Sequence, residues 1–353
     1  MSYSRVTARD VARHARVSPG TVSKAFSGKG AVHPDTHARI LDAARELGYR
    51  GHPTVDAPAT DLTPLRTVGL ISRSPFDRRT TPVLLGILER LTEHNMAFLA
   101  CDGRGDPIRE QYFIDSLSRR RVDGYIVSGS NAGSLSRISL GDRLNAPVVY
   151  AMTESTDERD VSVIPDNWGG MTSAVKHLLH TGRRRIVCIL GPAHEEAAKQ
   201  KIKACLDVLQ ANGLSFAAEP LHGTWEEEWG RQAVPQLIRS RAQFDGLICA
   251  NDAIARGVTA GLHEMGIRVP DEVGVVGFDN WGAMVEANRP RLTSVDLRLA
   301  EVGRTAAQLL INAIEERPAE SGTVVIPSRL VTRESTALDP SHLREEHTVR
   351  HTN

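Results

Sequence analysis

Short apolar runs alternate with amphipathic helical patterns over most of the chain, from residue 67 onward. The runs are rich in β-branched residues and have the length of strands, whereas the segments between them repeat apolar residues at intervals of three and four. We expect strands at 68–72, 97–101, 124–127, 148–150, 161–164, 186–190, 246–250, 273–277 and 324–326. We expect helices at 83–93, 108–119, 170–180, 196–212, 227–238, 254–265 and 302–315. This alternation predicts an α/β fold of doubly wound parallel sheets, with any ligand at the carboxyl ends of the strands.

The alternating region is about 270 residues long, and two such sheets are therefore a better expectation than one. We predict a two-lobed core at 66–337. Its first lobe comprises about 66–163 and 297–322, and its second lobe comprises about 164–294 and 323–337. A polar tail at 338–353 lacks the heptad leucines of a tetramerising coiled coil.

The first 50 residues have a different pattern, that of three short helices. Thr7 and Asp10 form a capping signal for the first helix, and Ser18 followed by Pro19 starts the second. The third helix begins at Pro34 and is followed by a glycine at position 48. This spacing predicts an all-α helix-turn-helix headpiece at 1–50. Residues 51–65 contain three prolines and no periodic apolar face, which predicts a linker.

Charge is divided unevenly along the chain. The whole sequence carries 43 Lys and Arg and 43 Asp and Glu, but its first 50 residues carry nine bases and four acids. A basic segment on an acidic remainder is expected where one end of a protein meets phosphate groups. A pair of solvated basic helices is the alternative interpretation of the same charges.

The four cysteines, at 101, 188, 205 and 249, lack the spacing of a metal or redox site, and we expect the last three to be buried and reduced. The sequence contains neither an apolar export signal near its start nor an apolar run of membrane-spanning length. We therefore expect a cytoplasmic protein.

In a helix-turn-helix, exposed side chains near the start of the second helix meet base edges in the major groove. Lys24 is the strongest donor here for a guanine edge or a phosphate, and the nearby serine and threonine hydroxyls suit phosphates. We predict a DNA-contact surface formed by Thr7, Ser18, Pro19, Gly20, Thr21, Ser23, Lys24 and Thr36.

The pattern T-x-x-D-V-A-x-x-A-x-V-S-x-x-T-V-S-K at 7–24 continues as V-x-P-x-T at 32–36 and L-G-Y at 47–49. It resembles the headpiece signature of the LacI/GalR family of bacterial transcriptional regulators. The resemblance implies a homodimer on near-palindromic double-stranded operator DNA. It also implies a core similar to periplasmic binding proteins, with a small effector, typically a sugar or sugar derivative, held between the two lobes.

The family's hinge helix follows the headpiece, and this sequence departs from it. His52, Val55 and Pro58 stand at the positions of the family's Asn, Ala and Leu, with Pro53 between them. A proline inside a helix costs about 3 kcal/mol, so we expect a less ordered hinge and a weaker bend in the operator.

The core resembles the family through G-P at 191–192, A-N-D-A-I-A at 250–255 and V-G-F-D-N at 276–280. The effector residues that the resemblance implies are Arg73, Asp77, Lys201, Trp225, Asn251 and Asp279. Trp225 would be the stacking aromatic. By residue type alone, Asn251 equally suits a helix cap, Asp279 a loop anchor and Trp225 the core.

Lys201 stands where the family has an Arg that binds vicinal hydroxyls in a bidentate manner, and Lys cannot do this. Either the effector differs, for example by carrying a phosphate or carboxylate, or the core has lost its ligand. The helix at 83–93 is unusually apolar, which suits either a dimer contact or ordinary core packing.

Other protein classes fit the sequence less well. A transport-type binding protein would need an export signal and no headpiece. The nucleotide-binding, hydrolase and metalloprotease motifs of enzymes are absent from the sequence, and residues 194–196 indicate a helix start rather than a site. We predict an effector-controlled DNA-binding repressor with no catalytic residue, cofactor, metal or membrane partner. The alternative is a DNA-binding regulator whose core only dimerises.

Overall fold

A computed structural model describes residues 7–27, 32–47, 49, 65–129, 146–155, 157, 159–317 and 321–337. The chain divides into two compact units, Met1–Leu65 and Arg66–Asn353. The tail predicted at 338–353 and all but the last residue of the linker predicted at 51–65 lie outside the described residues.

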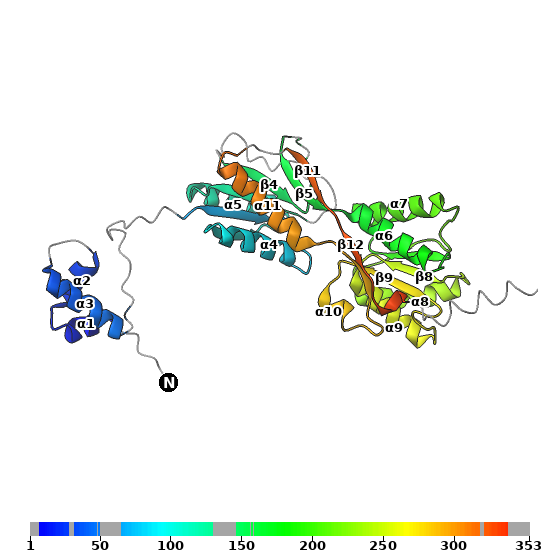
Figure 1. Cartoon of the computed structure of the whole chain (residues 1–353), viewed down its shortest axis with the longest axis horizontal. Coiled ribbons are helices and arrows are strands. Elements are labelled where there is room, and N and C mark those ends of the chain that lie inside the picture. The colour runs from blue at the N-terminus through cyan, green and yellow to red at the C-terminus, as the bar shows by residue number, and fades with distance from the viewer. Residues whose placement is uncertain are drawn as a thin grey trace, which may run out of the picture. The chain divides into compact units, whose positions relative to one another are not determined.

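The described residues of the first unit form three helices, as the capping signals predict: α1 (Ala8–His14), α2 (Pro19–Ser27) and α3 (Pro34–Glu46) (Figure 1). They enclose a small apolar core formed by Val11, Ala12, Ala15, Val22, Ile40, Ala43 and Ala44. Thr7 caps α1, because its backbone N–H and its hydroxyl both donate to Asp10 Oδ2, at 2.9 and 2.6 Å. His14 of α1 lies 2.7 Å from Glu46 of α3, and this contact joins the C-terminal ends of the two helices.

The first lobe of the second unit is built on a six-stranded parallel sheet of order β11-β5-β4-β3-β1-β2. Its strands are β1 (Thr67–Ser72), β2 (Ala97–Asp102), β3 (Gly124–Ser128), β4 (Val148–Ala151), β5 (Val161–Pro165) and β11 (Gly322–Ile326). Helices α4 (Thr80–Glu93) and α11 (Leu299–Ile314) pack on each other and on the sheet, and α5 (Pro107–Arg119) packs on β1. The inner strands β1, β3 and β4 are buried apolar runs because helices cover the sheet, whereas the edge strands β2 and β11 are partly exposed.

The second lobe holds another six-stranded sheet, of order β12-β10-β9-β8-β6-β7, in which only the β10–β12 pair is antiparallel. Its strands are β6 (Ile186–Leu190), β7 (Leu221–His222), β8 (Gly246–Cys249), β9 (Gly274–Phe278), β10 (Thr293–Asp296) and β12 (Arg329–Val331). Its helices are α6 (Asn167–His180), α7 (Glu196–Ala211), α8 (Glu227–Arg239), α9 (Asp252–Glu264) and α10 (Gly282–Val285). The fold class predicted from the sequence is confirmed: a helical headpiece and a two-lobed core of parallel sheets.

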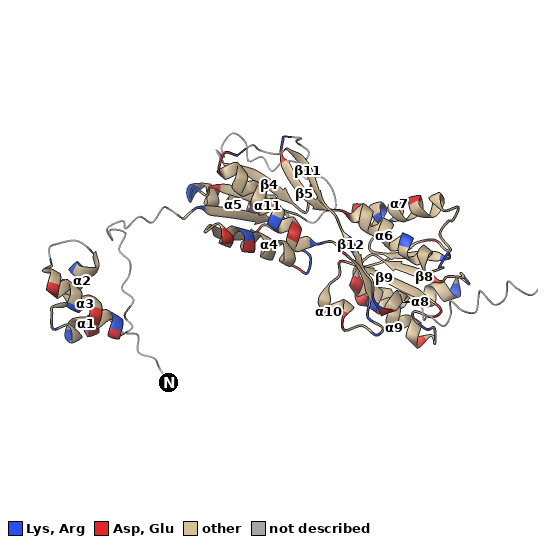
Figure 2. Cartoon of the chain, viewed as in Figure 1, with Lys and Arg blue, Asp and Glu red and all other residues tan. Residues whose placement is uncertain are grey.

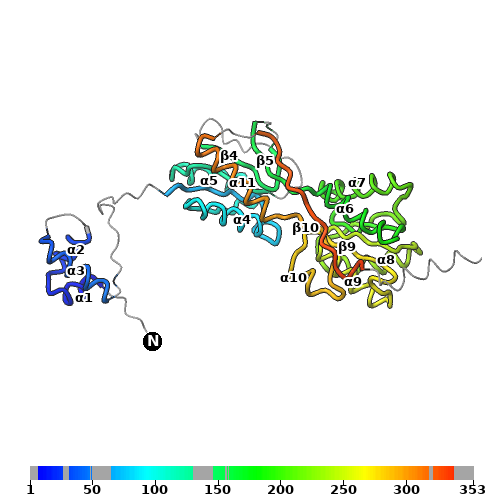
Figure 3. The backbone as a smooth tube through the Cα atoms, in the orientation of Figure 1, coloured from blue at the N-terminus to red at the C-terminus, as the bar shows by residue number. Residues whose placement is uncertain are grey.

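The chain crosses between the lobes three times: after β5, after β10 and after β11 (Figures 1 and 3). The third crossing comes later than predicted. Residues 323–326 were assigned to the second lobe, but β11 pairs with β5 along its whole length, from Gly322 opposite Val161 to Ile326 opposite Pro165. The first lobe therefore extends to Ile326.

Most predicted strands and helices are confirmed to within a few residues, but β7, β10 and β12 were not predicted. On α4, Val83, Ile87 and Leu91 are buried in the core, whereas Leu85 and Leu88 are exposed. Core packing thus accounts for most of the apolar face of this helix. None of the helices that the structure describes combines the length and the hydropathy needed to cross a membrane.

Candidate functional site

The start of α2 presents a polar surface to solvent. Ser18, Pro19, Gly20, Ser23 and Lys24 are exposed, whereas Val22 between them is buried in the headpiece core. Of the other predicted DNA contacts, Thr7 is exposed, and Thr21 and Thr36 are half-buried. The Ser18 hydroxyl oxygen accepts the N–H of Thr21 at 3.1 Å, so this side chain caps the helix that a helix-turn-helix inserts into the groove.

Several headpiece cations are free to meet phosphate. Figure 2 colours the charged residues on the ribbon. Arg13 lies 3.6 Å from Asp10 and Arg45 lies 3.1 Å from Asp42, and both are exposed pairs. Within the described part of the headpiece, no carboxylate pairs with the basic side chains of Arg9, Arg16, Lys24 and Arg39. Unpaired cations on the headpiece suit the backbone of a nucleic acid.

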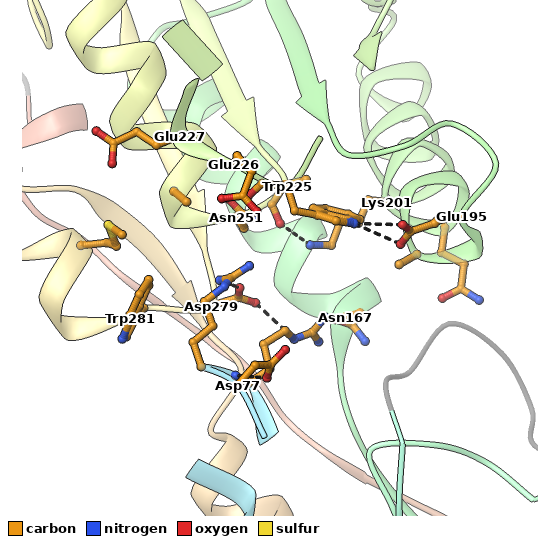
Figure 4. Close-up of a pocket in the computed structure, with 17 residues that line it drawn as sticks. Asp77, Asn167, Glu195, Lys201, Trp225, Glu226, Glu227, Asn251, Asp279 and Trp281 are labelled. Atoms are coloured by element: carbon orange, nitrogen blue, oxygen red, sulfur yellow. Dashed lines mark hydrogen bonds and ion pairs between the residues drawn. The ribbon is translucent and has the colours of Figure 1, made fainter. Parts of the chain in front are cut away.

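A cleft of about 780 Å³ lies between the lobes of the second unit (Figure 4). The chain segments that follow β1, β6, β7, β8 and β9 contribute to it, so it lies at the carboxyl ends of the strands, as predicted. Its lining is Asp77, Arg78, Arg79, Asn167, Glu195, Ala197, Gln200, Lys201, Trp225, Glu226, Glu227, Ala250, Asn251, Ala253, Asp279, Trp281 and Met284.

The indole ring of Trp225 has a fixed position and orientation in this cleft. A Cβ on Gly191 would come within 2.4 to 2.5 Å of three indole carbons of Trp225, so the ring can lie there only because residue 191 is a glycine. The indole N–H donates to both carboxylate oxygens of Glu195, each at 3.1 Å. Gly191 and Glu195 together fix the plane of the ring, and a fixed aromatic face is what a sugar or nucleoside ring requires.

Asn251 holds the backbone of Trp225 in place. Its side-chain oxygen accepts the N–H of Ile254 at 2.7 Å and caps α9, while its amide nitrogen donates to the carbonyl of Trp225 at 2.9 Å. The side chain is buried, and both of its polar atoms are engaged within the protein. The helix-cap interpretation of Asn251 is therefore confirmed, and the residue acts on the cleft by positioning Trp225.

Lys201 is buried, with 6% of its surface exposed. Its Nζ donates to the carbonyl of Ala250 at 2.5 Å and lies 3.6 Å from the centre of the Phe278 ring. Burial lowers the pKa of Lys201 to about 7; the nearby Asp279 carboxylate opposes this shift, and Arg79 and Arg78 reinforce it. The ammonium group therefore faces the Ala250 carbonyl at the end of β8 and the ring of Phe278. It is not left open to bind an anion.

Asp279 links the two lobes. It follows β9 in a left-handed backbone conformation, with φ of 97°. Its carboxylate accepts a 2.5 Å ion-paired hydrogen bond from Arg78, which belongs to the loop between β1 and α4. Arg79 Nε lies 3.9 Å from its other oxygen. Asp279 therefore anchors a contact across the cleft.

Asp252 lies behind the cleft and is fully buried. Its carboxylate accepts the backbone N–H of Trp281 at 2.6 Å and the hydroxyl of Ser294 at 2.5 Å. Burial raises the pKa of Asp252 to about 7 and the charge of Asp279 adds to this, against the lowering effect of the two hydrogen bonds. This carboxyl group ties the loop after β9 to α9 and thereby positions Trp281.

Five of the six predicted effector residues line the one cleft: Asp77, Lys201, Trp225, Asn251 and Asp279. Arg73 does not, and that prediction needs correction. Its Nε donates to the nearly buried Glu110 of α5 at 2.9 Å, because β1 ends with this side chain directed toward α5. Asp77 mainly holds the backbone at the start of α4, since its Oδ1 accepts the N–H groups of Arg79 and Thr80 at 2.8 and 3.0 Å.

Arg78, Glu195 and Trp281 are among the lining residues that were not predicted from the sequence. Residues 194–196 do start a helix, as predicted, but Glu195 also holds Trp225. The segment G-F-D-N-W at 277–281 carried a usable signal, because an aromatic residue two positions after a strand-end Asp lies at the same sheet edge. Among the described residues, no cluster of three or more His, Cys, Asp or Glu is arranged to hold a metal ion.

Comparison with known proteins agrees with this architecture. The profile described as "Bacterial regulatory proteins, lacI family" matches residues 7–52, and that described as "Periplasmic binding protein-like domain" matches residues 175–336. The HTH-type transcriptional repressor PurR of Aliivibrio fischeri strain MJ11 is 27% identical over 332 residues, which is 93% of this chain and 98% of that protein.

Two solved structures extend the agreement. The transcriptional regulator CelR in complex with cellobiose is 28% identical, with a TM-score of 0.64, and the match covers 94% of this chain and 100% of that one. The Lac repressor dimer bound to operator and the anti-inducer ONPF has a TM-score of 0.70 at 23% identity, with 95% and 100% covered, and shows the shared fold. The relatives are transcriptional repressors and not enzymes, and the headpiece, the two lobes and their order along the chain are all shared. Residues 7–52 thus match the model of the lacI family of bacterial regulatory proteins, and the chain is similar to transcriptional repressors over nearly its whole length.

Proposed function

We propose that this protein is a cytoplasmic, dimeric DNA-binding repressor whose DNA affinity is controlled by an uncharged sugar or sugar derivative bound between the lobes. The observation that carries the proposal is the cleft itself. It joins both lobes, and it presents the Trp225 ring on Gly191 beside hydrogen-bonding side chains. A ligand that touches both lobes can change their relative orientation and so shift the population of DNA-binding dimers.

The charges of the cleft favour an uncharged effector over a phosphorylated one. Its lining contains five carboxylates, on Asp77, Glu195, Glu226, Glu227 and Asp279, and three cations, on Arg78, Arg79 and Lys201. Arg78 is already paired with Asp279, and Lys201 is bonded to a carbonyl oxygen. A phosphate would meet an excess of negative charge, whereas sugar hydroxyls donate readily to carboxylates. A Lys at position 201 therefore does not require the effector to be charged.

A solved relative also favours a carbohydrate effector. CelR, at 28% identity, was solved as a complex with cellobiose. A flat aromatic ring with surrounding carboxylates and amides is the chemistry that binds such a ligand. We therefore extend a carbohydrate effector to this chain.

At the DNA end, we propose that α2 enters the major groove. Lys24 supplies a base or phosphate contact, and the hydroxyls of Ser18, Thr21 and Ser23, with Thr7 and Thr36, supply phosphate contacts. Pro19 and Gly20 have no side-chain donor and contact the DNA by shape. Specificity then depends on Lys24 and on the pairing of two half-sites.

The proposed dimer uses the open edge of the first sheet. β2 is an edge strand and exposes Leu99, and the helix after it, α5, exposes Ile108 and Tyr112, with 81% and 63% of their surfaces accessible. Ile108 and Tyr112 are four residues apart and share a helix face. An apolar surface beside an unpaired strand edge favours a second copy of this chain as its cover.

A second candidate function is a DNA-binding regulator whose core only dimerises. The observation in its favour is that Lys201, Asn251 and Asp279 all have partners within the protein. Thermal unfolding of the full chain with a panel of mono- and disaccharides separates the two functions. A ligand at 100 times its Kd adds about 2.7 kcal/mol to the free energy of unfolding and raises Tm by a few degrees. A saturable rise in Tm that Trp225→Ala abolishes supports an effector-sensing core. If no saccharide of the panel raises Tm, a core that only dimerises is supported.

A further inference from the structure

A second cavity of about 410 Å³ adjoins the main cleft. The two cavities share Arg78, Asp279 and Trp281 in their linings, so the Arg78–Asp279 ion pair lies between them. The rest of the second lining comes from α4, the loop after β9, and the segment from the end of β10 into α11: Pro82, Asn280, Gly282, Asp296, Arg298, Leu299, Ala300, Glu301 and Arg304. Both lobes again contribute. Nothing in the function proposed above uses this space.

Trp281 gives the second cavity an aromatic wall. It is 36% exposed, and its backbone is fixed by the hydrogen bond to the buried Asp252. Figure 4 shows the Trp225 and Trp281 rings apart from each other in the cleft. The Arg78 guanidinium carbon lies over the Trp281 ring, 5.8 Å from its centre, which is within the range of a cation–π contact. The ring is therefore fixed in position and still 36% exposed.

The second cavity is electrically balanced. Its cations are Arg78, Arg298 and Arg304, and its anions are Asp279, Asp296 and Glu301. Most of these groups are already paired: Arg78 with Asp279, Arg304 with Glu301 at 3.5 Å, and Asp296 with Arg329 at 3.1 Å. A balanced, paired lining does not attract a phosphate or a carboxylate, but it offers donors and acceptors to uncharged hydroxyl groups.

We propose that the effector is a glycoside of two or more linked rings. One ring lies on Trp225 in the main cleft, and the next lies on Trp281 in the second cavity. The linkage between them passes the Arg78–Asp279 pair, whose guanidinium and carboxylate face the hydroxyls beside it. This inference rests on the proposed carbohydrate effector. It adds that the effector has at least two rings and that Trp281 selects for the second ring.

Isothermal titration of the full chain tests this with matched probes: glucose against cellobiose and maltose, galactose against lactose and melibiose, and xylose against xylobiose. We expect at least one disaccharide to bind tenfold or more tightly than its own monosaccharides. Trp281→Ala should remove that advantage, because it weakens disaccharide binding by a larger factor than monosaccharide binding. Trp281→Phe should retain part of it, because it keeps an aromatic face.

Trp168→Ala is the matched control. Trp168 is also an exposed indole of the second lobe with a cation over its ring, Lys203 Nζ at 4.7 Å from the ring centre, but it lies in neither lining. Its removal should leave every Kd within twofold. Retained DNA binding by each variant shows that the chain is folded.

Two results would overturn the inference, and they differ in what else they overturn. If monosaccharides bind as tightly as disaccharides, or if Trp281→Ala weakens both equally, the second-ring site is wrong and the sugar effector stands. If no saccharide binds the wild-type chain, the proposed effector class fails and this inference fails with it.

Discussion

Lys201 imposes a stability cost that depends on pH, and replacing it by Met should remove that cost. Methionine has a similar length and no charge, so it fits the space beside Phe278 with little repacking. The folded chain holds Lys201 with a pKa of about 7 against an ordinary value of 10.5. Each pH unit between these values costs about 1.4 kcal/mol, so the buried ammonium lowers the free energy of unfolding by about 5 kcal/mol below pH 7.

The direction of the pH dependence follows from where the proton is held. Between pH 7 and 10.5 the unfolded chain keeps the Lys201 proton and the folded chain has lost it, so the unfolded state binds more protons. The contribution of Lys201 to the free energy of unfolding therefore rises with pH in this window. Lys201→Met should be more stable than the wild type at pH 6, and the difference should shrink by about 2 to 3 kcal/mol by pH 9.

Urea unfolding followed by circular dichroism measures this difference, from pH 6 to 9 for the wild type and Lys201→Met and from pH 4 to 7 for the control variant. Asp252→Asn provides a control of opposite sign, because the pKa of Asp252 is raised to about 7. Between pH 4 and 7 the folded chain keeps that proton, so this carboxyl group costs more stability as pH rises, and the advantage of the variant should grow. A Lys201→Met difference that stays constant from pH 6 to 9 would refute the assignment of Lys201 as a desolvated cation.

Three further predictions concern the cleft and the dimer. Gly191→Val should displace the Trp225 ring, because its Cβ would lie about 2.4 Å from the indole. Effector affinity measured by calorimetry should then fall at least tenfold. The control Lys199→Ala changes an exposed residue outside the lining and should have no effect. Asn251→Ala removes a helix cap, which costs about 1 kcal/mol, together with the bond to the Trp225 carbonyl, so stability and effector binding should fall together; an effect on stability alone would contradict its positioning role. Ile108→Glu should convert the dimer into a monomer in analytical ultracentrifugation with unchanged Tm of the core, and a persisting dimer would mean that another surface forms the interface.

The main elements of the core could be predicted from the sequence because parallel strands covered on both sides are continuous apolar runs. The three strands that were missed lack this signature for physical reasons. β7 has two residues and β12 has three, and both are edge strands. β10 has the polar sequence T-S-V-D although Thr293 and Ser294 are buried.

Those two hydroxyls are tolerated in the core because each has a partner: Thr293 contacts the Thr336 hydroxyl at 2.7 Å, and Ser294 donates to Asp252. Such partners lie about 40 residues away in the chain and leave no local pattern. The same holds at the site. Arg78 meets Asp279 across 201 positions, and Arg73 turns to Glu110 instead of the cleft, so neither placement follows from sequence spacing.

The central claim is that one chain binds DNA through α2 and that a saccharide in its cleft changes this binding. Fluorescence anisotropy of the full chain, on a labelled fragment from the region upstream of its own gene, tests both parts with the disaccharide that calorimetry identifies. We predict salt-dependent binding that Lys24→Ala weakens, and an apparent Kd that the disaccharide changes at least fivefold in the wild type but not in Trp225→Ala. A wild-type chain that binds this DNA with the same Kd at saturating disaccharide, or a Lys24→Ala chain that binds as the wild type does, would contradict the account.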